Sequence, residues 1–467
     1  MKVSDSYRWN NKHGLDKKVK KMEYDVIVIG GSASGITTAI TGKNAYPDKT
    51  FLMIRKEKHA IVPCGIPYIF GSLLETEKDM ISDDMFKKNK IEVKVDEVTH
   101  IDVIKKTCKT SDGTVFTYDK LVLATGSEAC IPSWLEGADK ENVFIIPKDK
   151  EYLDRALHQL SSAKKIITIG GGFIGVETSD ELRKIGKDVT IVEKLPHILG
   201  TAFDDEICEE VEKTLKQRDV RFITGVGISK IIGGKKATGV ELENGEVLSA
   251  DAILLTVGYQ PNTKLAVEAG LSLNEKGYIK VDEYMHTDNH DIMAVGDCAE
   301  KRDFITRKIS STMLASTACA EARIAGMNLF KLSAMKTFSG TIAIFSTALG
   351  NTGFGVAGVT EKTAVFEQFD IVTGSFTGVD KHPGTLPEVH KQTVKLIAAR
   401  EGGLVLGGEV IGGNSTGELT NLIGFIIQNK MTVNNILTAQ IGTHPLVTAP
   451  PTAYPLIKAA EVVAKKL

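Results

Sequence analysis

The stretch that decides the fold is "KKIITIGGGFIGVETSDELRKIGKDVTIVEK", residues 164–194. An apolar run is followed at once by Gly170, Gly172 and Gly175, and apolar residues then recur at helical spacing as far as Gly186, which is a stop signal for a helix. The three glycines have the G-x-G-x-x-G spacing of a dinucleotide-binding turn, which brings a pyrophosphate to the first amides of a helix. The stretch therefore predicts a strand, a glycine turn and a helix of a dinucleotide-binding unit.

Glu193 closes the next strand of this unit. A carboxylate at that position accepts hydrogen bonds from a ribose 2′-hydroxyl and repels a 2′-phosphate, which favours NADH over NADPH. Lys187 and Lys194 lie nearby in the sequence and weaken this preference, so that NADPH is also a candidate.

A second glycine turn lies earlier in the chain, in "YDVIVIGGSASGITTAITG", residues 24–42. A continuous apolar strand of this kind is typical of a parallel sheet with both faces covered. Gly30 permits the tight turn and Gly35 permits close packing of helix on strand, while Ser32 stands where the middle glycine is expected. Two such turns in one chain predict two dinucleotide sites, one for a flavin and one for a nicotinamide.

Three further apolar runs end in glycine turns: "LVLATGS" (121–127), "AILLTVGYQPN" (252–262) and "DIMAVGDCA" (291–299). The 164–194 stretch falls between the first and second of these runs. This order predicts that the second dinucleotide unit is inserted into the first.

Composition narrows the classes of partner. The 467 residues carry a formal net charge of −2, so no basic field for nucleic acid or an anionic membrane is present, and small molecules are expected as partners. The apolar runs are too short to cross a membrane. The six cysteines include no C-x-x-C pair, which excludes a zinc site or a secreted disulfide framework and favours a reducing cytoplasm. Residues 1–22 are rich in Lys and Arg and are predicted to be a disordered extension.

In combination these motifs resemble the FAD-dependent pyridine nucleotide-disulfide oxidoreductases, from residue 24 to about residue 467. The resemblance implies an FAD site and an NAD(P)H site. The FAD site is expected to involve Gly30, Ser32, Ala33, Gly35, Arg55, Thr125, Gly126 and Asp297. The nicotinamide site is expected to involve Gly170, Gly172, Gly175, Glu177, Glu193 and Gly258.

Cys64 lies in "HAIVPCGIPYIFGSLL", residues 59–74, and has no local cysteine partner. The segment "PCGIPY" resembles the single-cysteine branch of the family, which contains coenzyme A disulfide reductases, NADH oxidases and NAD(P)H-dependent sulfur, polysulfide and persulfide reductases. A cysteine at the start of a helix, with Lys56, Lys58 and His59 nearby, is expected to be held as a thiolate. We therefore predict that Cys64 attacks the sulfur of a substrate.

Two positions depart from the family pattern. The acidic residue expected after the first unit's second strand is replaced by Arg55, and Glu57 follows two positions later. The water-forming NADH oxidases carry a histidine in the first glycine loop where this chain has Ala33, which argues against oxygen as the main acceptor.

His444 and Pro445, within "IGTHPLVTAPPTAYP" (441–455), resemble the histidine-proline pair of the two-cysteine reductases. There the histidine comes from the other subunit and acts as acid-base partner of the thiol. The resemblance implies that His444 protonates the leaving sulfur across the interface of a homodimer.

Several other residues are predicted to have no catalytic role. No metal site is expected, because no H-E-x-x-H motif is present and the histidine pairs His286 and His290, and His382 and His390, lie in segments with loop character. Cys298 is expected to be a small packed residue.

The expected architecture is an α/β fold of two Rossmann-like units and an α+β dimerisation domain. The predicted limits are an extension at 1–22, an FAD domain at 23–147 and 270–333, an NAD domain at 148–269 and a dimerisation domain at 334–467. In the last domain, strands are predicted at 363–370 and 393–401 and a helix at 416–429.

The predicted function is NAD(P)H-dependent reduction of a low-molecular-weight disulfide, persulfide or polysulfide, with coenzyme A among the candidate ligands. The alternatives are an NADH oxidase, a reductase of a protein electron carrier such as rubredoxin, and a flavoprotein that senses NADH.

Overall fold

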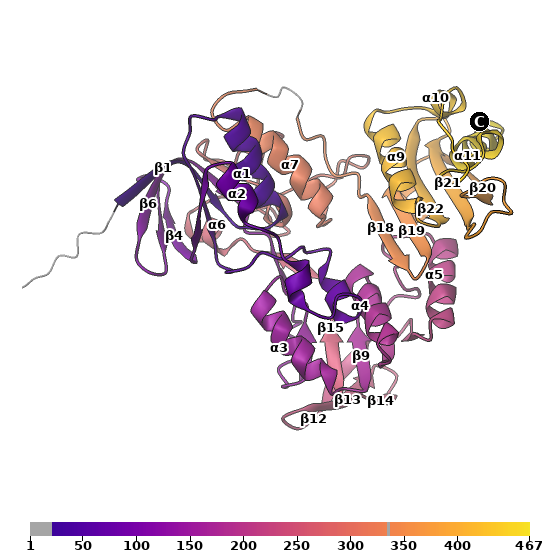
Figure 1. The fold of residues 1–467 in the computed structure, drawn as a ribbon, viewed down its shortest axis with the longest axis horizontal. Helices are drawn as coiled ribbons and strands as arrows, with labels where there is room; N and C mark the ends of the chain where they lie inside the picture. The colour runs from indigo at the N-terminus through magenta and orange to yellow at the C-terminus, as the bar shows by residue number, and fades with distance from the viewer. Residues whose placement is uncertain (1–20, 334–336) are drawn as a thin grey trace, which may run out of the picture.

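The computed structural model describes residues 21–333 and 337–467. Figure 1 shows three bodies: the first dinucleotide unit in indigo and salmon, the second in magenta and pink, and the C-terminal body in orange and yellow. Most of the predicted extension at 1–22 lies outside the described residues, and residues 21 and 22 begin the first strand. The α/β fold class is confirmed.

The first unit is built on a seven-stranded sheet in the order β3-β2-β1-β6-β5-β4, with β17 paired to β6. Its strands are β1 (Lys21–Ile29), β2 (Phe51–Arg55), β3 (Ile91–Val95), β4 (Val98–Asp102), β5 (Thr107–Thr110), β6 (Val115–Leu123) and β17 (Ile292–Ala294). The contacts of β1 with β2 and β6, and of β6 with β17, are parallel.

Both faces of this sheet are covered, which explains the continuous apolar run of β1. Val26 and Val28 pack with Ala39 and Leu329, towards α1 (Ala33–Ala45) and α7 (Ala315–Met327). Ile27 packs on the other face, in a core that includes residues of α6 (Lys264–Glu268). The short helices α2 (Asp84–Lys88), η1 (Ile66–Phe70), η2 (Thr76–Asp79) and η3 (Gly296–Cys298) lie in the connections.

The second unit has a parallel five-stranded sheet in the order β11-β10-β9-β15-β8. Its strands are β8 (Val143–Ile145), β9 (Lys165–Ile169), β10 (Asp188–Val192), β11 (Arg221–Ile223) and β15 (Ala252–Leu255). One face packs on α3 (Lys150–Ser161) and α4 (Phe173–Lys184), and the other on the three-stranded sheet of β12 (Ile228–Gly233), β13 (Ala237–Leu242) and β14 (Val247–Ser249). The chain then returns to the first sheet with β17.

The predicted domain limits at 147/148 and 269/270 stay predictions. The strand β8, which precedes residue 147, pairs with β15 and so lies in the second sheet. The two units are also joined by a two-stranded sheet of β7 (Ser127–Ala129) and β16 (Tyr259–Pro261).

The C-terminal body is an antiparallel sheet in the order β18-β19-β22-β21-β20. Its strands are β18 (Phe345–Leu349), β19 (Thr352–Gly358), β20 (Ile371–Val379), β21 (Lys391–Ala399) and β22 (Val405–Gly412). The helix α9 (Thr416–Gln428) packs along β19 and β22, and α11 (Pro455–Ala464) packs along β20 and β21. The shorter helices are α10 (Val433–Leu437) and η4 (Pro451–Ala453).

Strand β21 and helix α9 lie where the sequence predicts them, but the strand predicted at 363–370 is wrong. The first half of that segment lies in helix α8 (Glu361–Phe366), which begins where the Thr360 side chain accepts a hydrogen bond from the Thr363 amide. Val365 and Phe366 are 63% and 79% exposed. Val365 and Phe366 therefore lie on the exposed surface of a helix, whereas Ala364 of the same helix is buried.

The second unit and the C-terminal body share a core and a buried ionic contact. Phe354 and Val356 of β19 pack against residues of α5 (Asp205–Gln217). Next to this core, Lys395 of β21 is within 2.9 Å of the carboxylates of Asp204 and Glu361. The second unit is therefore packed firmly against the C-terminal body.

No helix in the described part of the chain combines the length and apolar character needed to cross a membrane.

Candidate functional site

The glycine turn of the first unit presents open amides. Gly30 has φ +118°, donates its N–H to the Ile54 carbonyl (2.9 Å) and lies so close to Ala124 that a Cβ would overlap that residue's carbonyl. Gly35 packs as closely on the Gly30 carbonyl. Helix α1 follows with no side-chain cap from Ser32 and no acidic residue in its first turn. Its first amides are therefore available to an anionic group such as a pyrophosphate.

The turn of the second unit repeats this geometry. Gly170 has φ +108° and a Cβ there would be 2.6 Å from the Thr256 carbonyl oxygen, and Gly175 packs on the Gly170 carbonyl. Gly172 precedes α4 without a side-chain cap, and a Cβ there would meet no atom within 4 Å. The open space over Gly172 is a cradle that a dinucleotide pyrophosphate fits.

The strand ends of the two units carry opposite charges. After β10, Glu193 accepts hydrogen bonds from the amides of Gly171 (2.6 Å) and Leu195 (2.8 Å). At the end of β2, the Arg55 guanidinium donates to both oxygens of Asp83 (2.8 and 2.7 Å). The second unit therefore presents a carboxylate directly, whereas the first presents an ion pair.

Lys187 and Lys194, the two lysines that left NADPH as a candidate, form contacts with other groups. Lys187, beyond the C-terminal end of α4, donates to the carbonyls of Ser161 and Ala163 (2.6 Å each). The exposed Lys194 forms an ion pair with Glu243 (3.1 Å). Neither contact leaves a lysine directed at Glu193.

The two glycine turns of "ATGS" and "VGYQPN" meet in the structure. The Thr125 hydroxyl donates to the Asn262 carbonyl (2.5 Å), and the Asn262 amide donates to the Gly126 carbonyl (2.9 Å). Gly126 and Gly258 both have positive φ, and a Cβ at either would meet no atom within 4 Å. The turns thus leave open space at the boundary of the two units.

Asp297 lies close to this boundary. It accepts hydrogen bonds from the Ser127 hydroxyl (2.7 Å) and the Lys148 ammonium (3.0 Å). Burial opposes ionisation of this carboxyl, but Lys148 and Ser127 outweigh it and hold the pKa of Asp297 below its usual value. Cys298, the next residue, is fully buried, as expected for a packed residue.

The Cys64 side chain is exposed and lies two residues before η1. Helix η1 packs on α4 of the second unit, and Ile66, Ile69 and Phe70 share a core with Leu182 of α4. The cysteine is therefore placed at the contact between the two dinucleotide units.

The expectation that Lys56, Lys58 and His59 would hold Cys64 as a thiolate is wrong. Burial of the thiol by the surrounding protein raises the pKa of Cys64, and Glu177 adds to this effect. Lys148 is the cation that opposes the shift. The helix that follows is a single short 3₁₀ segment, so little helix dipole is available.

Glu177 of α4 has an unusual protonation equilibrium. It accepts a hydrogen bond from the Thr347 hydroxyl of β18 (2.7 Å). Burial raises the pKa of Glu177 to about 7. Its charge therefore changes near neutral pH, beside the thiol of Cys64.

His444 lies in an exposed loop of the C-terminal body. Its Nδ1 accepts a hydrogen bond from the Leu446 amide (3.3 Å), and its own amide donates to the Thr448 hydroxyl (2.8 Å). These contacts are within its own loop and do not bring it to Cys64 of the same chain. Leu446 and Val447 beside it are 57% and 64% exposed.

The histidine pairs lie in loops, as predicted. His286 contacts Asp282 (3.2 Å), and its ring lies 6.2 Å from that of His290. His390 contacts Asp380 (3.0 Å), and His382 contacts the Thr448 carbonyl (3.0 Å).

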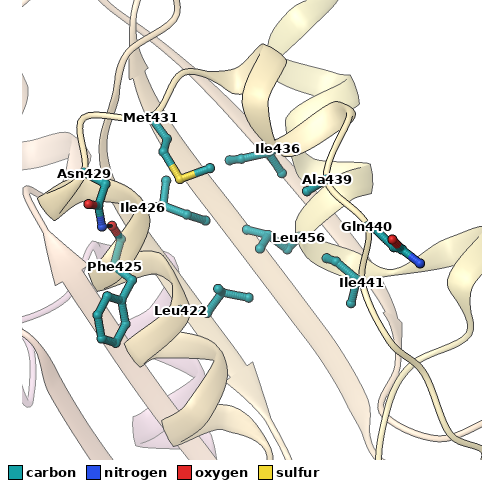
Figure 2. Close-up of a pocket in the computed structure, with 10 residues that line it drawn as sticks. All are labelled: Leu422, Phe425, Ile426, Asn429, Met431, Ile436, Ala439, Gln440, Ile441 and Leu456. Atoms are coloured by element: carbon teal, nitrogen blue, oxygen red, sulfur yellow. Dashed lines mark hydrogen bonds between the residues drawn. The ribbon is translucent and has the colours of Figure 1, made fainter.

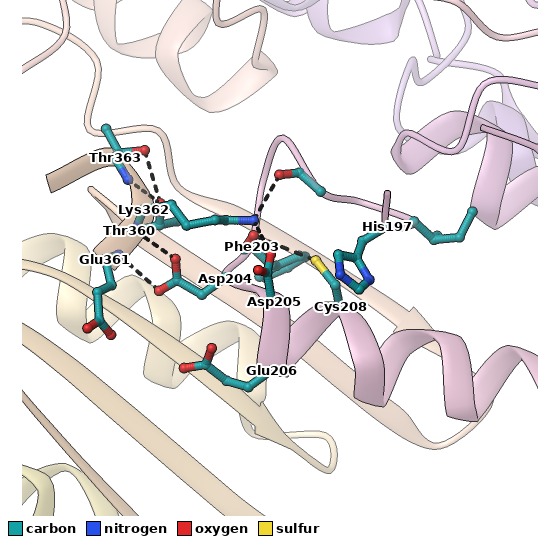
Figure 3. A network of polar contacts seen from close by, with 12 residues as sticks. His197, Phe203, Asp204, Asp205, Glu206, Cys208, Thr360, Glu361, Lys362 and Thr363 are labelled. Carbon is teal, nitrogen blue, oxygen red and sulfur yellow. Dashed lines mark hydrogen bonds and ion pairs between the residues drawn. The ribbon is translucent and has the colours of Figure 1, made fainter. Parts of the chain in front are cut away.

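One acidic cluster among the described residues has the spacing of a metal site, formed by Asp204, Glu206 and Glu361. The ammonium of Lys395 contacts all three carboxylates. Figure 3 shows Asp204 also accepting the backbone N–H of Glu361 (2.9 Å). Burial raises the pKa of the neighbouring Glu409 to about 8. The cluster is thus an ionic contact between the second unit and the C-terminal body.

A shallow apolar pocket of about 190 Å³ lies in the C-terminal body (Figure 2). It is lined by residues of α9, α10, α11 and the segment 439–441, including Leu422, Phe425 and Leu456. It contains none of the predicted cofactor residues.

Three residues of the site were missed by sequence reasoning: Lys148, Asp79 and Asp83. Asp79 packs so closely on Gly65 that a Cβ there would overlap its carboxylate, and burial raises the pKa of Asp79 to about 6. No local motif marks these three residues, because each acts on a segment distant in sequence.

The sequence matches the pyridine nucleotide-disulphide oxidoreductase family over residues 24–322 and the dimerisation domain of that family over residues 344–454. An NADH oxidase of Methanocaldococcus jannaschii is 31% identical over 94% of this chain and 99% of its own length. A CoA-dependent NAD(P)H sulfur oxidoreductase of Pyrococcus abyssi is 29% identical over 95% of this chain and 99% of its own length.

Among solved structures, an NAD-dependent persulfide reductase from A. fulgidus superposes with a TM-score of 0.88 and 27% identity, covering 95% of this chain and 83% of that one. The family match covers both dinucleotide units, and its dimerisation domain coincides with the C-terminal body. The chain is therefore a member of the pyridine nucleotide-disulphide oxidoreductase family.

Proposed function

We propose that the chain is an FAD-dependent reductase that uses NADH to reduce a low-molecular-weight disulfide, persulfide or polysulfide, with coenzyme A persulfide or disulfide as the leading candidates. The observation that carries this proposal is the place of Cys64. It is an exposed cysteine at the contact between two dinucleotide units, and charged groups of both act on it: Asp297 of the first, and Glu177 and Lys148 of the second. The names of the Pyrococcus and A. fulgidus relatives support the same substrate class.

The reaction balances with one nicotinamide per sulfur–sulfur bond. For a persulfide, R–S–SH, NADH and a proton give R–SH, H₂S and NAD⁺. Cys64 first gives up its thiol proton and then attacks one sulfur as a thiolate, the sulfur–sulfur bond breaks, and the departing sulfur takes a proton. FAD, when bound, carries the two electrons from the nicotinamide to the sulfur bound on Cys64.

The glycine turns are proposed to hold the two cofactors. FAD would lie on Gly30, Ser32, Ala33, Gly35, Thr125, Gly126 and Asp297, and the nicotinamide on Gly170, Gly172, Gly175, Glu177, Glu193 and Gly258. Glu193 favours NADH over NADPH, because it would repel a 2′-phosphate.

The dimerisation domain supports a homodimer. In it, His444 of one subunit is proposed to protonate the leaving sulfur at Cys64 of the other. The six free cysteines are consistent with the predicted cytoplasmic location.

A second candidate is an NADH oxidase that reduces oxygen. It is favoured by the name of the Methanocaldococcus relative and by the raised pKa of Cys64, which disfavours the thiolate. Ala33, where the water-forming oxidases have a histidine, weighs against it.

The test is anaerobic NADH consumption by the flavin-loaded protein with coenzyme A persulfide, coenzyme A disulfide and polysulfide in parallel. For the preferred substrate, Cys64→Ser is expected to lower turnover by at least about 100-fold, because the nucleophile is removed. The matched control is Cys130→Ser, at a half-buried cysteine near the boundary of the units, and it should retain turnover.

Equal turnover by wild type and Cys64→Ser would overturn the proposal. So would NADH consumption that requires oxygen and ignores all three sulfur compounds, since this result would leave the oxidase function.

A further inference from the structure

Arg55 and Glu193 occupy equivalent places in the two dinucleotide units. The first glycine of each turn donates its amide to the last carbonyl before these residues: Gly30 to Ile54, and Gly170 to Val192, both at 2.9 Å. The next glycine of each turn packs against the side chain in question. A Cβ on Gly31 would lie 2.6 Å from Cδ of Arg55, and a Cβ on Gly171 would lie 3.1 Å from Cβ of Glu193.

The position after the second strand of such a unit holds a carboxylate that binds the adenosine ribose. Glu193 fits this requirement in the second unit. Arg55 has no acceptor atom and cannot accept a hydrogen bond from a ribose hydroxyl. The first unit therefore needs another source for the carboxylate.

Asp83 supplies a carboxylate at this place. Both of its oxygens accept hydrogen bonds from the terminal nitrogens of Arg55, in a bidentate pair. The Arg55 side chain is only 2% exposed, whereas that of Asp83 is 42% exposed. The charged group that a ligand meets here is thus the carboxylate of Asp83 and not the guanidinium.

The pair has hydrogen-bonding capacity that the chain does not use. Each oxygen of an ionised carboxylate can accept two hydrogen bonds, and no further side-chain bond to Asp83 is formed within the described residues beyond those from Arg55. The Nε of Arg55 is buried and has no hydrogen-bond partner in the described part of the chain. A buried donor of this kind points to an acceptor that comes from outside the protein.

We propose that Asp83, held in place by Arg55, binds the adenosine ribose hydroxyls in the first dinucleotide site. The inference rests on the proposed use of FAD. Asp83 then takes the part that a carboxylate at the strand end has in the second unit, and Arg55 is a positioning residue. A ribose with free hydroxyls fits this site, and a phosphorylated ribose is repelled by Asp83.

The test compares FAD with FMN, which lacks the adenosine, on flavin-free protein prepared from the holoenzyme. Binding of each is followed by quenching of flavin fluorescence. Asp83→Asn keeps the shape of the side chain and removes its charge, so FAD affinity is expected to fall about tenfold, the effect of losing a hydrogen bond to a charged group. FMN affinity is expected to stay unchanged. The matched control is Asp84→Asn, an exposed neighbour, which should change neither affinity.

A second variant separates the two partners. Arg55→Lys retains the positive charge but loses the bidentate hold, so FAD affinity should fall less than in Asp83→Asn. If Arg55→Lys weakens FAD binding more than Asp83→Asn does, the guanidinium and not the carboxylate of Asp83 carries recognition of the ribose, and the proposal is overturned. If Asp83→Asn weakens FAD and FMN equally, or lowers only the melting temperature, the ion pair has a structural role alone and the proposal is overturned. Failure of the wild type to bind either flavin would instead contradict the proposed function.

Discussion

The two dinucleotide units of this chain share a backbone and differ in their polar ends. In both, the first glycine has positive φ and its amide donates to the neighbouring strand of the sheet, β2 or β10, and the following helix begins without a side-chain cap. The second unit presents Glu193 at its strand end, whereas the first presents Arg55 paired with Asp83. Under the proposed function, the shared backbone would bind the pyrophosphate that all dinucleotides have in common. The differing polar ends would meet the adenosine ribose, where NADPH differs from NADH and FAD by its 2′-phosphate.

The largest expected effect comes from disrupting the shared backbone in each unit separately. Gly30→Ala and Gly170→Ala each force a side chain into a positive φ and against a carbonyl oxygen. We expect each substitution to raise the free energy of the native turn, and so to weaken cofactor binding there, by roughly 2–5 kcal/mol. Gly30→Ala should abolish bound flavin, while Gly170→Ala should retain flavin and bind NADH at least about 30-fold more weakly. Flavin absorbance per chain and an NADH titration measure the two sites.

Gly113→Ala is the matched control for these variants. Gly113 has φ +87° and open space around it, so alanine there carries the conformational cost without the overlap. Gly113→Ala should change neither the amount of bound flavin nor the affinity for NADH. Loss of both cofactors in Gly30→Ala or Gly170→Ala would mean that the two sites are not independent.

This division also explains how much could be predicted from sequence. The glycine turns, their strands and the helices at 173–184 and 416–428 were predicted because each depends on residues adjacent in the chain. Residues 363–370 were misread because Val365 and Phe366 are exposed apolar residues, and alternation of apolar residues assumes that such residues are buried.

The electrostatic environment of the site could not be predicted in the same way. Arg55 meets Asp83 and Lys148 meets Asp297 across 28 and 149 residues of sequence. Cys64 has basic neighbours in the sequence, but the groups that act on its thiol in the structure include Glu177 and Lys148. Charges on segments distant in sequence thus reverse the expectation drawn from local ones.

A smaller effect is expected from altering the ribose end of the second unit. Glu193→Gln removes the charge that a 2′-phosphate would meet and weakens the acceptor for a ribose hydroxyl. The ratio of kcat/KM for NADH to that for NADPH should fall about tenfold or more. Lys187→Met is the control, because Lys187 is bonded to backbone carbonyls beyond the far end of α4. An unchanged ratio in Glu193→Gln would show that another group selects the nicotinamide.

The smallest effect lies at Cys64, where charges of the second unit act on a cysteine from the first. The pKa of Cys64 is raised, so its thiolate, and with it the rate of alkylation by iodoacetamide, increases as pH rises above the ordinary range of a cysteine. Glu177, with a pKa of about 7, is neutral below that pH and charged above it, so its carboxylate opposes thiolate formation on the alkaline side.

Glu177→Gln should therefore leave the alkylation rate below pH 6 unchanged and raise it about threefold at pH 8–9, whereas Lys148→Met should lower it by a similar factor at the same pH. Glu75→Gln, at an exposed carboxylate of the same connection, is the control for general changes in charge. Because the assay contains no nicotinamide, it reads the charges at Cys64 without requiring turnover. If Glu177→Gln and Lys148→Met both leave the pH profile of alkylation unchanged, the second unit does not tune this thiol, and the two units meet at Cys64 through packing alone.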